Sequence, residues 1–270
     1  MTVRADLSRR LFLAELGRGT IALAVVGIAG CAPAGSGTSG ATSRSATTSG
    51  AASPAPAGST GSASPGSPAS SAGGGDGVTW EQVDLGFVSA YVLARGGEAA
   101  VVDTGTAGSE DDIAAALERI GLGWDAVGHV IVTHHHGDHA GSLPAVLAAA
   151  ADATGYAGAE DLPSISSPRP LVAVADGDDV FGLRILATPG HTPGSISVLD
   201  EAGGILVAGD ALGTSAGAVQ GSNPQFTADM DAALASVARL GTFEYETLLV
   251  GHGDPIVGGA SDMVAAYQPG

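Results

Sequence analysis

The sequence predicts an α/β fold in which helices cover two β-sheets, and three observations support it. Short strand-like apolar runs alternate with stretches of helical period throughout residues 78–270, and such interleaving is typical of sheets with helices packed on their faces. These 193 residues are enough for one sizeable core. The single cysteine of the chain excludes an intramolecular disulfide, so stability must come from that core or from a metal.

The elements of the first half follow from residue periodicity and turn signals. A Gly-Gly turn at 96–97 joins two strands. Ser109, with Asp112 three residues later, predicts a capped helix that ends near Ile120. A second helix is predicted over 142–151, with a proline in its first turn. The strands of this half are expected at 78–85, 88–93, 99–102 and 130–133.

The second half continues the alternation. Helical period predicts helices over 228–240 and 262–267. Residues 211–226 are interpreted as a substrate-facing loop, in which Gln225 and Phe226 are candidates for ligand contact. The strands of this half are expected at 171–174, 180–187, 196–199, 205–208 and 247–250.

The composition is strongly acidic. Ten Lys and Arg, all of them Arg, stand against 28 Asp and Glu, for a formal charge of −18. Non-specific nucleic-acid binding needs cations that neutralise phosphates, so the charge argues against a nucleic-acid partner. It also argues against electrostatic attachment to anionic lipid. No apolar run reaches the roughly 18 residues of a membrane-spanning helix.

Residues 1–30 have the pattern of a bacterial export signal. A positive segment containing Arg9-Arg10 is followed by a short apolar stretch and small residues. The arginine pair resembles a twin-arginine signal, and Ile28-Ala29-Gly30-Cys31 resembles a lipobox, in which Cys31 is lipidated and becomes the mature N-terminus. The alternative is an N-terminal helix with a chance arginine pair and a buried cysteine. The signal predicts an extracytoplasmic lipoprotein of the bacterial cell membrane, held there by its N-terminal lipid anchor.

Residues 31–77 are predicted to be the lipidated Cys31 followed by a disordered linker. From 32 onward the segment is almost entirely Ala, Gly, Ser, Thr and Pro, with Arg44 and Asp76 as its only charges. Such a composition buries too little apolar surface to offset chain entropy. A glycosylated stalk is the alternative. Residues 78–270 are then the folded domain.

Histidine and aspartate gather at predicted strand ends in a pattern typical of a metal site. Residues 133–139 read Thr-His-His-His-Gly-Asp-His and follow a short strand. His191 and His252 lie in glycine-flanked turns after later strands, and Gly209-Asp210 follows another. Imidazole and carboxylate suit zinc and related metals. His129 and His135 are interpreted as structural or surface residues.

The motif His134-x-His136-x-Asp138-His139, followed by His191, Asp210 and His252 in order, resembles the metallo-β-lactamase superfamily. The resemblance covers about residues 78–260 and implies an αββα four-layer sandwich with two divalent metal ions at one edge of the sheets. Zinc is the default metal, with iron or manganese as alternatives. The implied ligands are His134, His136 and His191 for one metal, Asp138, His139 and His252 for the other, and Asp210 as the bridge.

The resemblance also implies a mechanism, in which a metal-bridging hydroxide attacks an ester, thioester, lactone or similar bond of a small-molecule substrate. Asp138 would be the catalytic residue that orients the hydroxide or moves a proton. Asp103, in an Asp-Thr-Gly turn, either hydrogen-bonds to a ligand histidine from behind the metals or only forms the turn.

Four hypotheses about the function remain, and the first two are a glyoxalase II-like hydrolase and a β-lactam hydrolase. The bridging Asp210 favours a glyoxalase II-like hydrolase over a β-lactam hydrolase, although Ser142 replaces a usual glycine and the chain has no Lys to bind a glutathione carboxylate. Quorum-sensing lactonases carry a tyrosine shortly after this aspartate, where the present chain has Ala211-Leu212-Gly213. The third hypothesis is a mononuclear-iron dioxygenase of the same superfamily, and the fourth is a non-catalytic surface metal-binding lipoprotein.

A rival nucleophile motif lies at 213–217. These residues read Gly-Thr-Ser-Ala-Gly and match the G-x-S-x-G elbow of serine hydrolases. That motif requires a helix directly afterwards, and residues 218–224 have the composition of a loop. We therefore interpret the match as chance in a chain rich in Gly, Ser and Ala.

Overall fold

The computed structural model describes residues 77–269. The predicted export signal, Cys31 and nearly all of the linker lie outside the described residues. Within the described part, no helix is long and apolar enough to cross a membrane.

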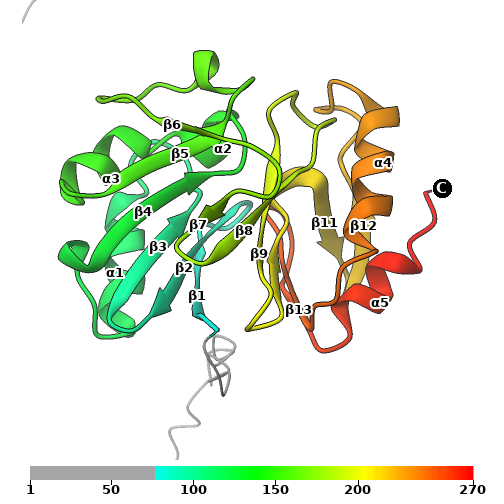
Figure 1. The fold of residues 1–270 in the computed structure, drawn as a ribbon, viewed down its shortest axis with the longest axis horizontal. Helices are drawn as coiled ribbons and strands as arrows, with labels where there is room; N and C mark the ends of the chain where they lie inside the picture. Colours follow the sequence, from blue (N-terminus) through cyan, green and yellow to red (C-terminus); the bar gives the residue numbers. More distant parts are fainter. Residues whose placement is uncertain (1–76, 270) are drawn as a thin grey trace, which may run out of the picture. The chain divides into compact units, whose positions relative to one another are not determined.

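Two six-stranded sheets form the centre of the domain (Figure 1). The first has the strand order β1 to β6, with β1–β3 antiparallel and β3–β6 parallel. Its strands are β1 Thr79–Asp84, β2 Ser89–Arg95, β3 Glu98–Val102, β4 Val127–Val132, β5 Thr154–Gly158 and β6 Val172–Val174. The helical segments of this half are α1 Glu110–Arg119, η1 Trp124–Ala126, α2 Gly137–Ala140, α3 Leu143–Ala149 and η2 Leu162–Ser164.

The second sheet has the order β14-β13-β10-β9-β8-β7, in which β10 and β13 run parallel and the other neighbours are antiparallel. Its strands are β7 Asp179–Val180, β8 Leu183–Ala187, β9 Ile196–Asp200, β10 Ile205–Val207, β13 Thr247–Leu249 and β14 Ile256–Val257. A separate hairpin pairs β11 Leu212–Ser215 with β12 Ala218–Gly221. The helical segments here are η3 Gly209–Ala211, α4 Met230–Leu240 and α5 Ala260–Ala265.

Three apolar layers hold these elements together, and they follow from strand alternation. On β2, Val92 faces α1 and α3, whereas its neighbour Tyr91 faces the second sheet. On β10, Val207 faces the first sheet, whereas Leu206 packs under α4 and α5. Figure 1 shows the resulting order of helices, sheet, sheet and helices. The predicted αββα sandwich is therefore confirmed.

Several local predictions differ from the structure. The range 180–187 forms two strands, because Phe181 and Gly182 both have positive φ and make a tight turn. Ser109 occupies the N-cap position of α1, but its side chain accepts no hydrogen bond from the helix. Within 211–226 the chain forms the β11–β12 hairpin, which excludes a nucleophile elbow at 213–217. Strand β5 has no counterpart among the predicted strands, since its sequence TGYAG has little apolar pattern.

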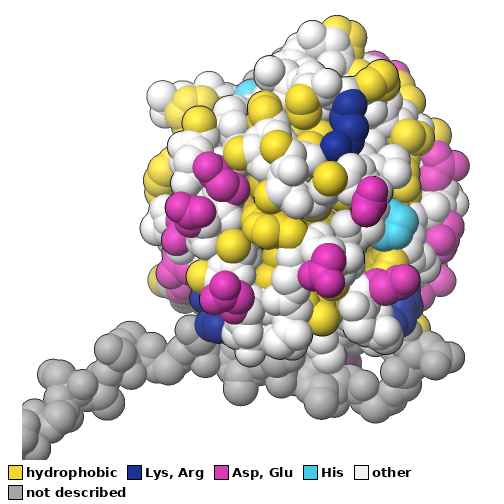
Figure 2. Space-filling model, turned by 90° about the vertical axis from the view of Figure 1, so that its left-hand side faces the viewer, with side chains coloured by type: hydrophobic (Ala, Val, Ile, Leu, Met, Phe, Trp, Pro, Cys, Tyr) yellow, Lys and Arg dark blue, Asp and Glu magenta, His cyan; other side chains and the backbone are white. Residues whose placement is uncertain are grey.

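The surface reflects the acidic composition. Figure 2 shows one face of the domain, on which Asp and Glu side chains are spread widely and Arg atoms occur in only a few places. Residues 78–270 contain 25 acidic residues and five Arg. The field of the domain therefore repels anions.

Candidate metal centre

The C-terminal ends of several strands meet at one edge of the two sheets and carry the predicted site residues. His134 and His136 follow β4, and His191 lies in the turn after β8. Asp210 and His252 follow β10 and β13, which are parallel neighbours. Asp138 and His139 lie on the short helix α2.

One group of imidazoles comprises His134, His136 and His191. Nδ1 of His136 lies 3.1 Å from Nε2 of His134 and 2.9 Å from Nε2 of His191. Ligand atoms of all three lie within 4.8 Å of one another. His134 and His191 are buried, whereas His136 is partly exposed. Three convergent ring nitrogens form one half of a possible metal centre.

A second group comprises Asp138, His139 and His252, whose ligand atoms also lie within 4.8 Å of one another. Nε2 of His252 lies 3.4 Å from Oδ2 of Asp138. Asp210 lies between the two groups: its Oδ1 is 3.2 Å from Nε2 of His139, and its Oδ2 is 3.2 Å from Nε2 of His191. Its carboxylate thus faces both groups at once.

The outer nitrogens of four histidines are held by fixed acceptors. Nδ1 of His139 donates to Asp103 at 2.8 Å, and Nδ1 of His252 donates to the Phe87 carbonyl at 2.6 Å. Nδ1 of His134 contacts Oγ1 of Thr133, and Nδ1 of His191 contacts Oγ1 of Thr227.

Each of these threonine hydroxyls donates elsewhere, to Asp103 and to the Asn223 carbonyl respectively. Each must therefore accept from its histidine. In all four residues Nδ1 is the donor to these acceptors, so Nε2 is the nitrogen that faces the centre and can bind a metal once it carries no proton.

Nε2 of His139 and Oδ1 of Asp210 are buried and lie only 3.2 Å apart, yet neither atom forms a hydrogen bond of normal geometry among the described residues. Buried polar atoms are rarely unpaired, so such a pair needs an explanation. A cation bound by both atoms would satisfy them. The donor set of imidazoles and carboxylates fits zinc, iron or manganese.

The electrostatics of the protein alone also call for positive charge. Burial opposes charge on His139, but Asp103 and Asp210 outweigh it and raise its pKa to about 10. Asp138 and Asp210 raise the pKa of His252 to about 10. Burial lowers the pKa of His191 to about 4 and that of His134 well below its usual value. The carboxylates thus require cationic partners, which either protons or metal ions can supply.

Asp103 has the contacts expected of a residue that orients a ligand. Besides His139, its carboxylate accepts from the backbone N–H and the hydroxyl of Thr133. Its backbone has φ of +61°, a conformation that side-chain-bearing residues seldom adopt. Such strain is typical of functional positions. Asp103 therefore both forms the turn and accepts the hydrogen bond from His139.

Asp161 is a buried residue that the sequence offered no signal for. Its Oδ2 accepts from the His135 N–H at 2.9 Å and from the Thr192 hydroxyl at 2.6 Å, and its Oδ1 accepts from the Gly194 N–H. It therefore ties the 134–139 segment to the turn that carries His191. These contacts could not be predicted from the sequence, in which Asp161 is only part of a Glu-Asp pair in a segment with no predicted element.

We expect Asp161→Ala to weaken metal binding by about 10- to 100-fold, as loss of residues that support ligands does. The two ligand-bearing turns would lose their common acceptor. Titration of the metal-free protein with Zn²⁺ against a competing chelator measures this. Asp152→Ala removes an exposed carboxylate and is the control. Equal Zn²⁺ affinity in both variants would show that Asp161 does not position the ligands.

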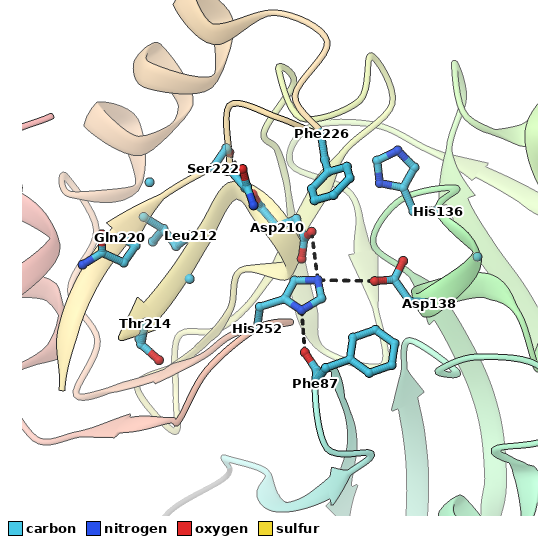
Figure 3. A pocket seen from close by; sticks show the side chains of 14 residues that line it. Phe87, His136, Asp138, Asp210, Leu212, Thr214, Gln220, Ser222, Phe226 and His252 are labelled. Atoms are coloured by element: carbon cyan, nitrogen blue, oxygen red, sulfur yellow. Dashed lines mark hydrogen bonds and ion pairs between the residues drawn. The ribbon is translucent and has the colours of Figure 1, made fainter. Parts of the chain in front are cut away.

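A pocket of about 700 Å³ opens over the centre. Its polar floor includes His136, Asp138, Asp210 and His252, and its walls include apolar side chains. Figure 3 shows Leu212, Thr214 and Gln220 of the hairpin on one side of Asp210 and His252, and Asp138 and His136 on the other. Phe226 lines the pocket as expected, whereas Gln225 is not among its lining residues.

The two histidines interpreted as structural residues are placed differently. His129 packs against Tyr156 and Phe181, away from the centre. His135 is adjacent to the centre, but its Nδ1 faces Asp161 at 3.1 Å.

The chain is similar to several known proteins. The family described as the metallo-beta-lactamase superfamily matches residues 83–252. The uncharacterized protein YobT of Bacillus subtilis (strain 168) is 29% identical, covering 67% of this chain and 89% of YobT. A hydroxyacylglutathione hydrolase of Dechloromonas aromatica (strain RCB) is 34% identical over 58% of this chain, which spans only 58% of that relative's length. The structure of TTHA1623 in a di-iron-bound form has a TM-score of 0.56 and 26% identity, covering 67% of this chain and 94% of TTHA1623.

Proposed function

The chain belongs to the metallo-beta-lactamase superfamily, and on this basis we propose that it is a hydrolase with two divalent metal ions that cleaves ester, thioester, lactone or similar bonds. The observation that carries the proposal is the position of Asp210, with one carboxylate oxygen facing each ligand group. A carboxylate between two sets of nitrogen ligands suits a dinuclear catalytic centre better than a site for metal transfer.

The residues divide between the metals as follows. His134, His136 and His191 would hold one ion, Asp138, His139 and His252 the other, and Asp210 would bridge them. Bound there, two such ions supply Lewis acidity for the substrate carbonyl and lower the pKa of a shared water so that it becomes a nucleophile. Zinc is the first candidate, and iron and manganese also fit the donor set.

The chain's own groups then orient the reaction. Asp138 is more exposed than the buried histidines and lines the pocket, so its carboxylate can accept a proton at Oδ2 from the attacking water. Asp103 and the Phe87 carbonyl hold the rings of His139 and His252 in place.

The residues of the chain also bear on the competing hypotheses. A β-lactam hydrolase remains a candidate reaction, but the chain lacks any Lys for a substrate carboxylate. The relative that is a hydroxyacylglutathione hydrolase supports thioester cleavage, again without Lys in this chain. A mononuclear-iron dioxygenase would leave the group of Asp138, His139 and His252 without a metal. A non-catalytic metal carrier would not need Asp210 between two ligand groups.

Assays of the full-length protein test the proposal. The metal-free protein is loaded with Zn²⁺, Fe²⁺ or Mn²⁺ and tested with a 4-nitrophenyl ester, a thioester and a lactone. We expect turnover of at least one substrate, its loss after chelation and its recovery on adding metal. Oxygen consumption without hydrolysis would support the dioxygenase instead. Metal binding without any turnover would support the carrier.

We also propose that the protein is an extracytoplasmic lipoprotein anchored through Cys31 to the bacterial cell membrane. The proposal rests on the sequence of residues 1–31. We expect Cys31→Ser to move the protein from the membrane fraction to the soluble fraction when bacterial cells are fractionated. If the variant stays with the membranes, the lipid anchor is wrong. Thr38→Ser, within the same segment, is the control.

A further inference from the structure

Two of the four exposed large apolar side chains of the described residues line the pocket. Phe87 is 63% exposed and Phe226 is 58% exposed. Figure 3 shows their rings on opposite sides of the carboxylates of Asp138 and Asp210. Exposed aromatic rings beside a cavity are typical of a binding site. They leave room between them for the part of a substrate next to the reacting bond.

Both phenylalanines are connected to residues of the metal centre, directly or through a neighbouring residue. The Phe87 carbonyl accepts from His252, and its ring stacks on that imidazole with centroids 6.3 Å apart. Phe226 donates its N–H to the Asn223 carbonyl and directly precedes Thr227, which contacts His191. An apolar group lying between the rings would therefore have a fixed position relative to the centre.

The pocket provides no cation from a Lys or Arg side chain. The chain has no Lys, and none of the pocket's lining residues is Arg. The arginines of the described part interact elsewhere: Arg95 with the Phe181 carbonyl, Arg119 with Glu81, Arg169 with the carbonyls of Leu147, Ala150 and Ala153, Arg184 with Glu201, and Arg239 with Asp176.

The remaining polar groups of the pocket walls are neutral. The hydroxyls of Thr214 and Ser222 donate to backbone carbonyls, which leaves the amides of Gln220 and Asn223. A substrate carboxylate placed against these walls would lose hydration without gaining an ionic partner. The acidic surface adds repulsion.

We infer that the pocket takes an uncharged ester, thioester or lactone whose apolar arm lies between Phe87 and Phe226, and that it selects against substrates with a carboxylate on that arm. This inference rests on the proposed hydrolase function and names its substrate class. Phe87 and Phe226 are then specificity-determining residues, and Gln220 of the hairpin lines the same pocket.

A matched pair of esters tests the selection. The zinc-loaded full-length protein is assayed with 4-nitrophenyl pentanoate and with mono-4-nitrophenyl glutarate, which has an acyl chain of equal length ending in a carboxylate. After subtraction of spontaneous hydrolysis, we expect kcat/KM to favour the neutral ester by about tenfold or more. Equal values would overturn the inference while leaving the hydrolase function intact.

Substitutions in the pocket test its origin. Phe226→Ala should lower kcat/KM for the pentanoate by about tenfold, a larger factor than for 4-nitrophenyl acetate, because acetate has no arm. Gln220→Arg should reduce the preference for the neutral ester by about fivefold, because it places a cation in the pocket. Ala149→Arg makes the same charge change on α3, whose residues do not line the pocket. If Ala149→Arg reduces the preference equally, the pocket is not its source and the inference fails.

Binding to the metal-free protein separates this inference from the hydrolase function. Calorimetry compares pentananilide, a neutral amide, with glutaric acid monoanilide. Tighter binding of the neutral compound supports the inference even if no ester is hydrolysed, in which case only the proposed function fails. Equal or tighter binding of the acid overturns the inference.

Discussion

Asp210→Asn is expected to lower kcat on the order of 10³-fold, the scale of removing one charge-stabilising group from a catalytic site. The amide keeps the shape of the side chain but lacks the negative charge that faces both ligand groups. Among the seven proposed ligands, Asp138 would be the only remaining carboxylate. We also expect the variant to retain fewer metal ions than the parent. Steady-state kinetics and elemental analysis of the same sample measure both effects.

The control for this variant is Asp152→Asn, which removes the same charge from an exposed position outside the pocket. We expect it to keep the parent's activity and metal content. If Asp210→Asn instead retains two ions and parental kcat, Asp210 is not a bridging ligand, and the division of the site into two groups loses its basis.

Gly251→Ala is expected to cause the second-largest loss, although residue 251 is not itself a proposed ligand. A Cβ added there would lie 2.5 Å from Oδ1 of Asp210 and 2.5 Å from Cε1 of His139. Both side chains are packed tightly, so they must move out of their positions. We expect metal affinity to fall by about 100-fold and the metal-free protein to lose about 1–3 kcal/mol of stability.

Gly128→Ala provides the matched control for this change. A Cβ at position 128 meets nothing within 4 Å, and Gly128 lies on β4 of the first sheet. In the metal-free state, Gly251→Ala should therefore unfold at a lower denaturant concentration than Gly128→Ala. It should also bind Zn²⁺ more weakly. Parental metal affinity in Gly251→Ala would mean that the centre tolerates displacement of Asp210 and His139, contrary to their close packing in the structure.

Most of the fold followed from the sequence because its strands are short apolar runs with clear turns between them. The exceptions have physical causes. The range 180–187 is strand-like apart from Gly182, and the turn there also needs a positive φ at Phe181, which a residue with a bulky side chain seldom adopts. The β11–β12 hairpin consists largely of small and polar residues, a composition that favours a loop when only the sequence is considered.

The proposed metal ligands could be predicted from the sequence, whereas most of the residues that orient them could not. The histidines and aspartates stand out because imidazole and carboxylate side chains cluster beside glycines at strand ends. The residues that orient them are of ordinary types: a threonine hydroxyl at 133 and at 227, the carbonyl of Phe87, and the buried carboxylate of Asp161. Their roles depend on contacts across the fold, which a linear sequence does not display.

Two ligand groups bridged by Asp210 should hold two metal ions, and metal stoichiometry tests this most directly. The full-length protein is saturated with Zn²⁺, freed of loosely bound ions and analysed for zinc per chain. We expect two equivalents in the parent and fewer in both His134→Ala and Asp210→Asn. One equivalent or none in the parent would contradict the dinuclear centre and, with it, the proposed hydrolytic mechanism.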